Sequence, residues 1–137
     1  MHHIRLRTPW TLEILEQTSP STPALKFHRT AEVPGDWSAL LGAAFRGRVR
    51  YTRSFNSPTG LQAGQRIWLV LEGVTGEAEV RLGDRLLGVA TPTACPSRYN
   101  ISNDLQHRNL LSIDITQPSE ASPPGGLTGE VRLEIES

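Results

Sequence analysis

Hydrophobic and polar residues alternate along most of the chain, which is the pattern of β-strands that bury one face. In residues 48–55, Val49, Tyr51 and Phe55 fall on one side of the predicted strand. Residues 66–73 are apolar on nearly both sides, which is typical of a central strand. The same alternation predicts strands at residues 3–7, 11–16, 25–29, 78–82, 85–90, 109–115 and 130–136.

The segments between these strands are rich in proline, glycine and serine, as at 17–23, 56–64 and 116–126. Only residues 36–45 break the alternation. Asp36 can cap a helix there, and the apolar spacing that follows supports one or two helical turns. Short strands with turn signals at this spacing predict an all-β fold, a β-sandwich with one short helix. The length of 137 residues predicts a single domain over residues 1–137.

Gly83 and Asp84 separate two of the predicted strands and indicate a hairpin with a two-residue turn. A type II′ turn requires positive φ at its first residue, which glycine adopts without steric cost. We therefore expect Gly83 to have a structural role.

The charge balance bears on the kind of partner. The chain has 14 basic and 14 acidic residues, for a formal net charge of zero. A nucleic-acid-binding protein needs a basic face, so we expect no nucleic-acid partner. No apolar run approaches the roughly 18 residues of a transmembrane helix, and the N-terminus lacks the apolar region of a signal peptide. We expect no membrane partner and a cytoplasmic protein.

The residues that could support catalysis or metal binding are scattered. The single cysteine, Cys95, excludes an internal disulfide and any multi-cysteine metal site. No nucleophile elbow, Walker loop or dinucleotide-binding motif occurs. The histidines lack the spacing of metal ligands; they are His2, His3, His28 and His107. The strand carboxylates occupy positions typical of a surface; they are Glu77, Glu79, Glu130, Glu134 and Glu136. We expect no enzyme activity, no metal site and no cofactor.

Several segments, taken in order, resemble one family. They are VPGDWS (33–38), VRYTRSF (49–55), RIWLVLEGVTGEAEVRLGDRLLG (66–88), SRYNISNDL (97–105) with RNLLSIDI (108–115), and GGLTGEVRLEI (125–135). Over about residues 30–136 the chain resembles the sugar-binding domain at the N-terminus of glycoside hydrolase family 2 enzymes, such as β-galactosidases and β-glucuronidases. The resemblance implies a jelly-roll β-sandwich of the galactose-binding-domain-like type.

This resemblance implies a non-catalytic carbohydrate-binding module. The family's catalytic glutamates lie on a separate (β/α)₈ barrel of roughly 250 residues, which a chain of this length cannot contain. The candidate ligand contacts lie near the predicted connections and offer planar hydrogen bonding or stacking. They are Trp37, Arg98, Tyr99, Asn103 and Asp104. Trp37 has a second interpretation, as an anchor of the short helix against the sandwich, and we expect Trp68 to pack in the second layer.

Two other functions remain open. The first is a structural or interaction protein that forms a homodimer through sheet edges, for which residues 4–10 and 130–137 are the candidate edges. The second is an accessory subunit of a split glycoside hydrolase, with a partner glycosidase. By analogy, galactose-binding-like sandwiches also hold a structural calcium ion, and Asp84, Asn103 and Asp104 are the available oxygen ligands.

Arg53 is the unusual residue of its strand because it shares a face with Val49, Tyr51 and Phe55. A buried guanidinium is costly unless it is paired. One hypothesis pairs Arg53 with Glu72 or Asp104. The alternative is an arginine that reaches solvent along its aliphatic stem.

Overall fold

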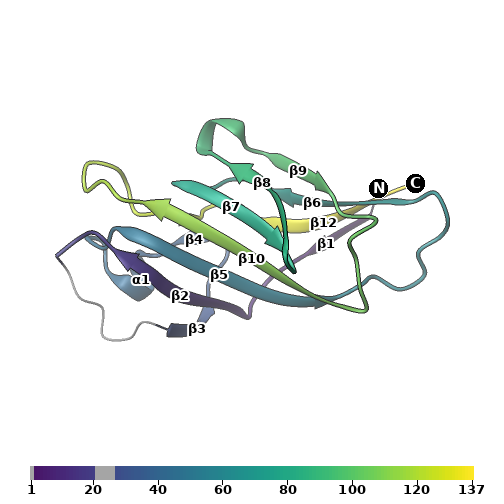
Figure 1. The fold of residues 1–137 in the computed structure, drawn as a ribbon, viewed down its shortest axis with the longest axis horizontal. Coiled ribbons are helices and arrows are strands. Elements are labelled where there is room, and N and C mark those ends of the chain that lie inside the picture. The colour runs from purple at the N-terminus through teal and green to yellow at the C-terminus, as the bar shows by residue number, and fades with distance from the viewer. Residues whose placement is uncertain (1, 21–26) are drawn as a thin grey trace.

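The computed structural model describes residues 2–20 and 27–137, and two antiparallel sheets form its main layers (Figure 1). The six-stranded sheet has the order β3 (Phe27–Ala31), β2 (Trp10–Gln17), β5 (Gly47–Asn56), β10 (Arg108–Gln117), β7 (Glu77–Leu82) and β8 (Arg85–Ala90). The four-stranded sheet has the order β1 (His2–Arg5), β12 (Val131–Glu136), β6 (Arg66–Leu71) and β9 (Ser97–Asn100). The remaining elements are the pair β4 (Gly35–Asp36) and β11 (Gly126–Leu127), helix α1 (Ser38–Leu41) and a 3₁₀ turn, Pro92–Ala94.

The predicted all-β sandwich with one short helix is confirmed. The core lies between the two sheets and takes alternate residues from each, such as Tyr51 and Ile113 from one layer and Leu69 and Leu133 from the other. The predicted strands are present with small shifts at their ends. Residues 25 and 26 of the predicted third strand lie outside the described residues.

Helix α1 is shorter than the predicted helix over residues 36–45. Asp36 belongs to β4, and Trp37 takes the N-cap position. The Asp36 carboxylate nevertheless accepts a hydrogen bond of 2.9 Å from the backbone N–H of Ser38. The helix ends at Gly42, whose φ of 90° is a conformation that glycine adopts readily.

The two ends of the chain meet in the four-stranded sheet. β1 pairs antiparallel with β12, from His2 opposite Ile135 to Arg5 opposite Arg132. Both termini therefore lie at the same side of the sandwich (Figure 1). The N-terminal strand is an edge, as predicted, but the prediction of a C-terminal edge strand is wrong because β12 lies between β1 and β6.

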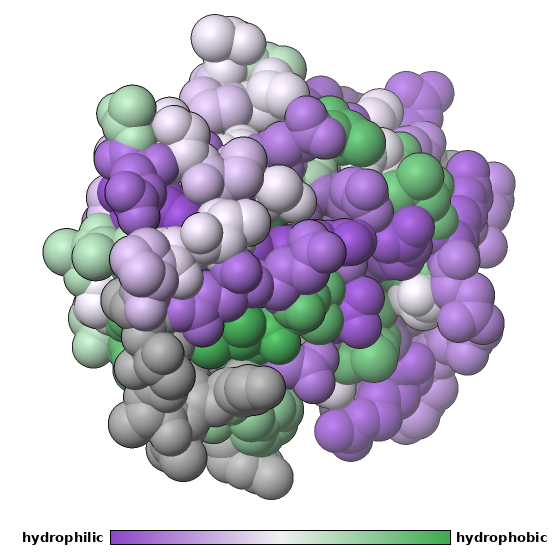
Figure 2. Space-filling model, turned by 60° about the vertical axis from the view of Figure 1, so that its left-hand side comes forward, coloured by the Kyte–Doolittle hydropathy of each residue, from purple (hydrophilic) through white to green (hydrophobic). Residues whose placement is uncertain are grey.

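One side of the molecular surface is mainly polar. Figure 2 shows the side of the molecule on the left of Figure 1, where hydrophilic residues cover most of the view and hydrophobic ones form smaller areas between them. No helix in the described residues is long and apolar enough to cross a membrane.

The turn between β7 and β8 has the predicted geometry. Leu82 pairs with Arg85 across it, Gly83 has a φ of 58°, and Asp84 does not have positive φ. This is the pattern of a type II′ turn. A Cβ added at Gly83 would meet no atom within 4 Å, so the backbone conformation alone restricts this position.

We expect Gly83→Val to lower the free energy of unfolding by at least about 1 kcal/mol, because a β-branched residue resists positive φ. Asp84→Ala at the exposed second turn position is the control and should change it by less than about 0.5 kcal/mol. Urea unfolding of the three proteins measures both values. Equal stability of Gly83→Val and the wild type would contradict the turn assignment.

Candidate functional site

The five side chains that the sequence suggests as ligand contacts lie in different parts of the molecule. Trp37 precedes α1, Arg98 and Tyr99 lie on β9, and Asn103 and Asp104 lie in the loop between β9 and β10. Of these five, Asn103 and Asp104 line one pocket together.

Trp37 is not a surface for stacking against a ligand, because its side chain is only 1% exposed. Its indole Nε1 donates a hydrogen bond of 3.1 Å to the carbonyl oxygen of Phe45. The two rings meet edge to face, with their centroids 5.4 Å apart. This burial contradicts the ligand-contact interpretation of Trp37 and agrees with its interpretation as an anchor of the short helix.

Arg98 and Tyr99 point to opposite faces of β9, because successive side chains of a strand alternate. Tyr99 is half-buried and packs against the core, with its ring over Gly88 of β8. Burial raises the pKa of the Tyr99 hydroxyl. Arg98 lies on the outer face of the four-stranded sheet, so one ligand cannot contact both side chains.

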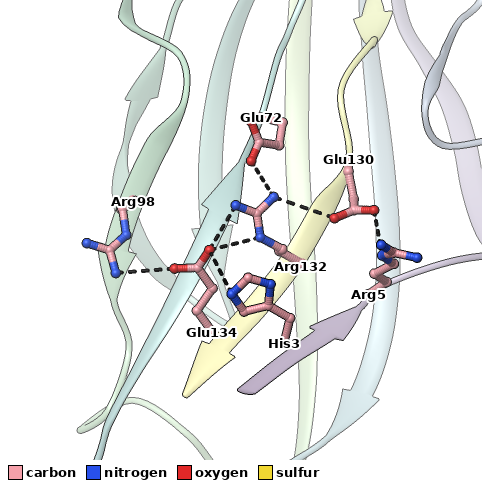
Figure 3. Close-up of polar contacts among 7 residues, drawn as sticks. All are labelled: His3, Arg5, Glu72, Arg98, Glu130, Arg132 and Glu134. Carbon is pink, nitrogen blue, oxygen red and sulfur yellow. Dashed lines mark hydrogen bonds and ion pairs between the residues drawn. The ribbon is translucent and has the colours of Figure 1, made fainter. Parts of the chain in front are cut away.

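Charged side chains cover the outer face of the four-stranded sheet (Figure 3). Arg132 of β12 lies at the centre of this network and is mostly buried. Its guanidinium forms ion pairs with Glu72, with Glu130 at 3.5 Å and with Glu134 at 2.8 Å. Glu130 also pairs with Arg5 of β1 at 2.8 Å. The network links β12 to β1 and to Glu72, the residue that follows β6.

Glu134 is the most buried carboxylate of this network, with its side chain 8% exposed. Besides Arg132, it faces Arg98 at 3.3 Å and the imidazole of His3 at 3.6 Å. Burial by itself would raise the pKa of Glu134. The hydrogen bonds and positive charge of Arg132, with smaller effects of His3 and Arg98, outweigh burial and hold the pKa below its usual value.

This lowered pKa predicts how stability depends on pH. Glu134 stabilises the fold above its unfolded-state pKa of about 4.3, and the contribution is lost as pH falls through the lower folded-state pKa. We expect Glu134→Gln to be less stable than the wild type at neutral pH and to lose less stability on acidification. Urea unfolding at several pH values between about pH 6 and pH 3 measures this. Glu136→Gln, at a more exposed ion pair with Arg66, is the control, and parallel pH curves for the wild type and Glu134→Gln would refute the prediction.

Trp68 also lies on this outer face and not in the core between the sheets, so the expectation of a second-layer residue is wrong. It pairs in register with Glu134 of β12 and Asn100 of β9. The guanidinium carbon of Arg98 lies 4.4 Å from the centre of its ring, in a cation–π contact. Arg98 thus covers a ring that could otherwise stack on a sugar.

Across residues 2–20 and 27–137, no carboxylate forms an ion pair with Arg53, so the hypothesis that it pairs with Glu72 or Asp104 is wrong. Its guanidinium donates hydrogen bonds to the backbone carbonyl oxygens of Arg7 and Ser54. Glu72 pairs with Arg132 and Asp104 pairs with Arg85. The half-buried Arg53 has its pKa lowered by desolvation.

A pocket of about 380 Å³ lies between the turn after β7 and the loop before β10. We call it the hairpin–loop pocket. Its charged and amide-bearing side chains include Asp84, Arg85, Asn103, Asp104, Gln106 and Arg108. At this pocket the N–H of Gly83 donates a hydrogen bond of 2.9 Å to the carbonyl oxygen of Leu110, which holds the turn beside β10.

The loop of this pocket is fixed by side chain to backbone hydrogen bonds. Asn100 Oδ1 accepts hydrogen bonds from the N–H and the hydroxyl of Ser102, at 3.0 and 2.6 Å. The Ser102 hydroxyl oxygen accepts the N–H of Ile67 at 2.9 Å, which ties the loop to β6. Asn109, which is buried, bonds both the N–H and the carbonyl oxygen of Gln106. The polar side chains of the loop are therefore presented from a defined backbone.

Asp104 orients a neighbouring cation. Its Oδ1 accepts a hydrogen bond from Arg85, the residue that follows the hairpin turn, and its Oδ2 is buried without a hydrogen-bond partner in residues 2–20 and 27–137. Arg85, Asp84 and Asn103 are exposed. Carboxylate, amide and guanidinium groups together can donate to and accept from adjacent hydroxyl groups.

The pocket does not fit a calcium ion, although Asp84, Asn103 and Asp104 all line it. Calcium requires several oxygen ligands, but one oxygen of Asp104 already binds a guanidinium and the other is covered. Within the described ranges, no group of three or more His, Cys, Asp or Glu side chains is placed to hold a metal.

The sequence suggests Asn103 and Asp104 of this pocket as sugar contacts and Asp84 as an oxygen ligand, but it does not predict Arg85, Gln106 and Arg108 there. The pocket depends on the pairing of β7 with β10, where Leu82 lies opposite Leu111. Residues that far apart give no local signal of their contact. The position of Arg85 next to a predicted turn was the one available clue.

No model of a protein family matches the sequence, and no curated protein matches it. Among solved structures, the chain is similar to the β-glucuronidase of Bifidobacterium dentium in complex with coumarin-3-O-glucuronide. The sequence identity is 22%, the TM-score is 0.79, and the match covers 98% of this chain and 30% of that one.

Two further structures show the same similarity. The FMN-binding β-glucuronidase of Faecalibacterium prausnitzii is 22% identical with a TM-score of 0.75, over 96% of this chain and 22% of that one. The glycoside hydrolase family 2 β-galacturonidase of Eisenbergiella tayi, bound to galacturonate, is 20% identical with a TM-score of 0.71. The match covers 97% of this chain and 24% of that one. The chain thus has the fold of one part of these enzymes and spans less than a third of each.

Proposed function

We propose that the chain is a non-catalytic carbohydrate-binding module of the type found in family 2 glycosidases, with the jelly-roll architecture of that domain. The observation that carries this proposal is the hairpin–loop pocket, in which exposed carboxylate, amide and guanidinium groups converge on a backbone fixed by hydrogen bonds. The fold supports it, because the similar enzymes contain this fold as a part of a longer chain.

The absence of catalysis is part of the proposal. Family 2 hydrolysis uses two carboxylates on either side of the glycosidic bond. In the hairpin–loop pocket, Asp104 is committed to Arg85, which leaves Asp84 as the only exposed carboxylate of the pocket. One exposed carboxylate can bind a hydroxyl group but does not form the pair that hydrolysis requires.

The test is calorimetric titration of the full chain with methyl β-galactoside, methyl β-glucoside and methyl β-glucuronide. We expect saturable binding of at least one sugar. Asn103→Ala should weaken it roughly three- to tenfold, the value of one lost hydrogen bond. Gln62→Ala, at an exposed amide outside the pocket, is the control. Absence of binding to all three sugars, or equal affinity of Asn103→Ala and the wild type, would overturn the proposal.

A second candidate function is an interaction module that binds a second copy or a partner glycosidase. It is favoured by three large apolar side chains, Leu86, Val89 and Leu110, which are each about half exposed in the six-stranded sheet. Leu86 and Val89 belong to the edge strand β8, and a shift of register within β8 precedes Val89. Light scattering after gel filtration tests this function. A monomer whose mass does not change with concentration would exclude the homodimer.

A further inference from the structure

A second pocket, of about 350 Å³, is lined by arginines and by no acidic residue. We call it the arginine pocket. It lies where β5 ends beside β1 and the start of β10, and its charged residues are Arg5, Arg53 and Arg108. The hairpin–loop pocket differs from it because Asp84 and Asp104 are among its lining residues.

Two of these arginines have no carboxylate within ion-pair distance among the residues that the structure describes. In residues 2–20 and 27–137, no carboxylate oxygen lies within the 4 Å of an ion pair from the guanidinium of Arg53 or Arg108, whereas Arg5 is paired with Glu130. Exposed cations without a counter-ion are common and cost little. Arg53 is different because it is half-buried on a strand that it shares with buried Tyr51 and Phe55.

The position of the Arg53 guanidinium is fixed by backbone groups. Its Nε donates to the carbonyl oxygen of Arg7, and its Nη1 donates to that of Ser54 at 2.6 Å. These contacts leave Nη2 without a protein acceptor in the described part of the chain. Neutral carbonyl oxygens orient the group but do not cancel its charge, and partial desolvation of a cation without an anion is unfavourable.

We propose that the arginine pocket binds the oxyanion group of a small molecule, a sulfate, a phosphate or a carboxylate. Guanidinium groups bind such groups with two parallel hydrogen bonds, and a site that is partly desolvated strengthens them. Arg53 supplies the oriented donor and Arg108 the more exposed one. The pocket volume is within the range of small-molecule sites.

This anion site goes beyond the proposed sugar binding and does not depend on it. The two pockets share Arg108. An acidic saccharide could therefore place hydroxyl groups in one pocket and its anionic group in the other. An inorganic anion would occupy the arginine pocket alone, so the two proposals are tested with different probes.

The experiment is a titration of the full chain followed by ¹H–¹⁵N NMR, including the Nε–Hε signals of arginine. The probes are sodium sulfate, sodium phosphate, sodium glucuronate and glucose, with ionic strength held constant by sodium chloride. We expect saturable shifts with at least one anion at Arg53, Arg108 and residues 54–56. Glucose should cause no such shifts at Arg53 and residues 54–56, which do not line the hairpin–loop pocket. Shifts with glucuronate alone would assign the anion to a saccharide, and shifts with sulfate or phosphate would assign a small inorganic group.

Arg108→Gln is the main variant because Arg108 is exposed and its replacement leaves the core intact. We expect it, and Arg53→Gln, to weaken anion binding roughly tenfold or more, as for a lost charged hydrogen bond. Arg66→Gln removes an exposed arginine outside both pockets and should bind as the wild type does. Anion shifts that do not saturate, or equal affinity in Arg108→Gln and the wild type, would overturn the proposal. Binding of glucose in the hairpin–loop pocket would concern the proposed sugar binding alone and would not change the conclusion about the anion site.

Discussion

Trp37→Ala is expected to be the most destabilising single substitution considered for this protein, with a loss of about 3–5 kcal/mol in the free energy of unfolding. The indole is buried between α1 and the sandwich, in edge-to-face contact with Phe45 and hydrogen-bonded to its carbonyl oxygen. Its ring also fills the space beside Gly125, where an added Cβ would come within 2.7 Å of Cη2. Alanine would leave a cavity and a carbonyl oxygen without its donor.

Chemical denaturation followed by far-ultraviolet circular dichroism measures this loss. Trp37→Phe keeps most of the volume and should recover part of the stability. Trp68→Ala is the matched control, because it removes an indole from the outer face of a sheet and should cost less. A loss below about 1.5 kcal/mol for Trp37→Ala would show that Trp37 contributes little to holding α1 against the sandwich.

Asp114→Ala is expected to have the second largest effect, a loss of about 2–3 kcal/mol. Asp114 of β10 is 2% exposed, and its carboxylate pairs with Arg50 at 2.7 Å and with Arg48 at 3.1 Å on β5. The hydrogen bond and charge of Asp114 raise the pKa of Arg50 despite desolvation. Alanine would leave the guanidinium groups of Arg48 and Arg50 without their shared carboxylate, beside a small buried cavity. Both are more than a third exposed, so solvent would reduce the cost.

Glu79→Ala is the matched control for Asp114→Ala. Glu79 is a partly exposed carboxylate on the same sheet and also pairs with Arg48, at 3.7 Å. We expect its loss to cost less than about 1 kcal/mol, as for a surface ion pair. Equal losses for the two alanine variants in urea unfolding would show that the burial of Asp114 adds nothing.

The strands of this fold could be predicted from the sequence because their periodicity is local. The alternation in 48–55 and 130–136 reflects one buried face, and both segments form strands. The pair β4 and β11 could not be predicted, since two-residue strands show no period. The place of β12 within its sheet depends on pairing with β1, which no local pattern reports.

The candidate site could be predicted only in part, for a related reason. Asn103 and Asp104 lie in a polar loop that the sequence indicates. The partner of Asp104 is Arg85, and the partner of Glu72 is Arg132. Both pairs join segments that are far apart in the sequence, so no local pattern reports them. The opposite directions of Arg98 and Tyr99 could have been inferred, because adjacent residues of a strand face opposite sides.

The pairing of β1 with β12 has a mechanical consequence. The two strands are antiparallel, and the chain ends lie at the same end of the pair, with His2 opposite Ile135. A force that pulls the two ends apart would therefore act on one pair of hydrogen bonds at a time, and not on the whole ladder at once. Tethered by its ends, the protein would open by peeling β1 from its sheet while the core between the sheets is still closed.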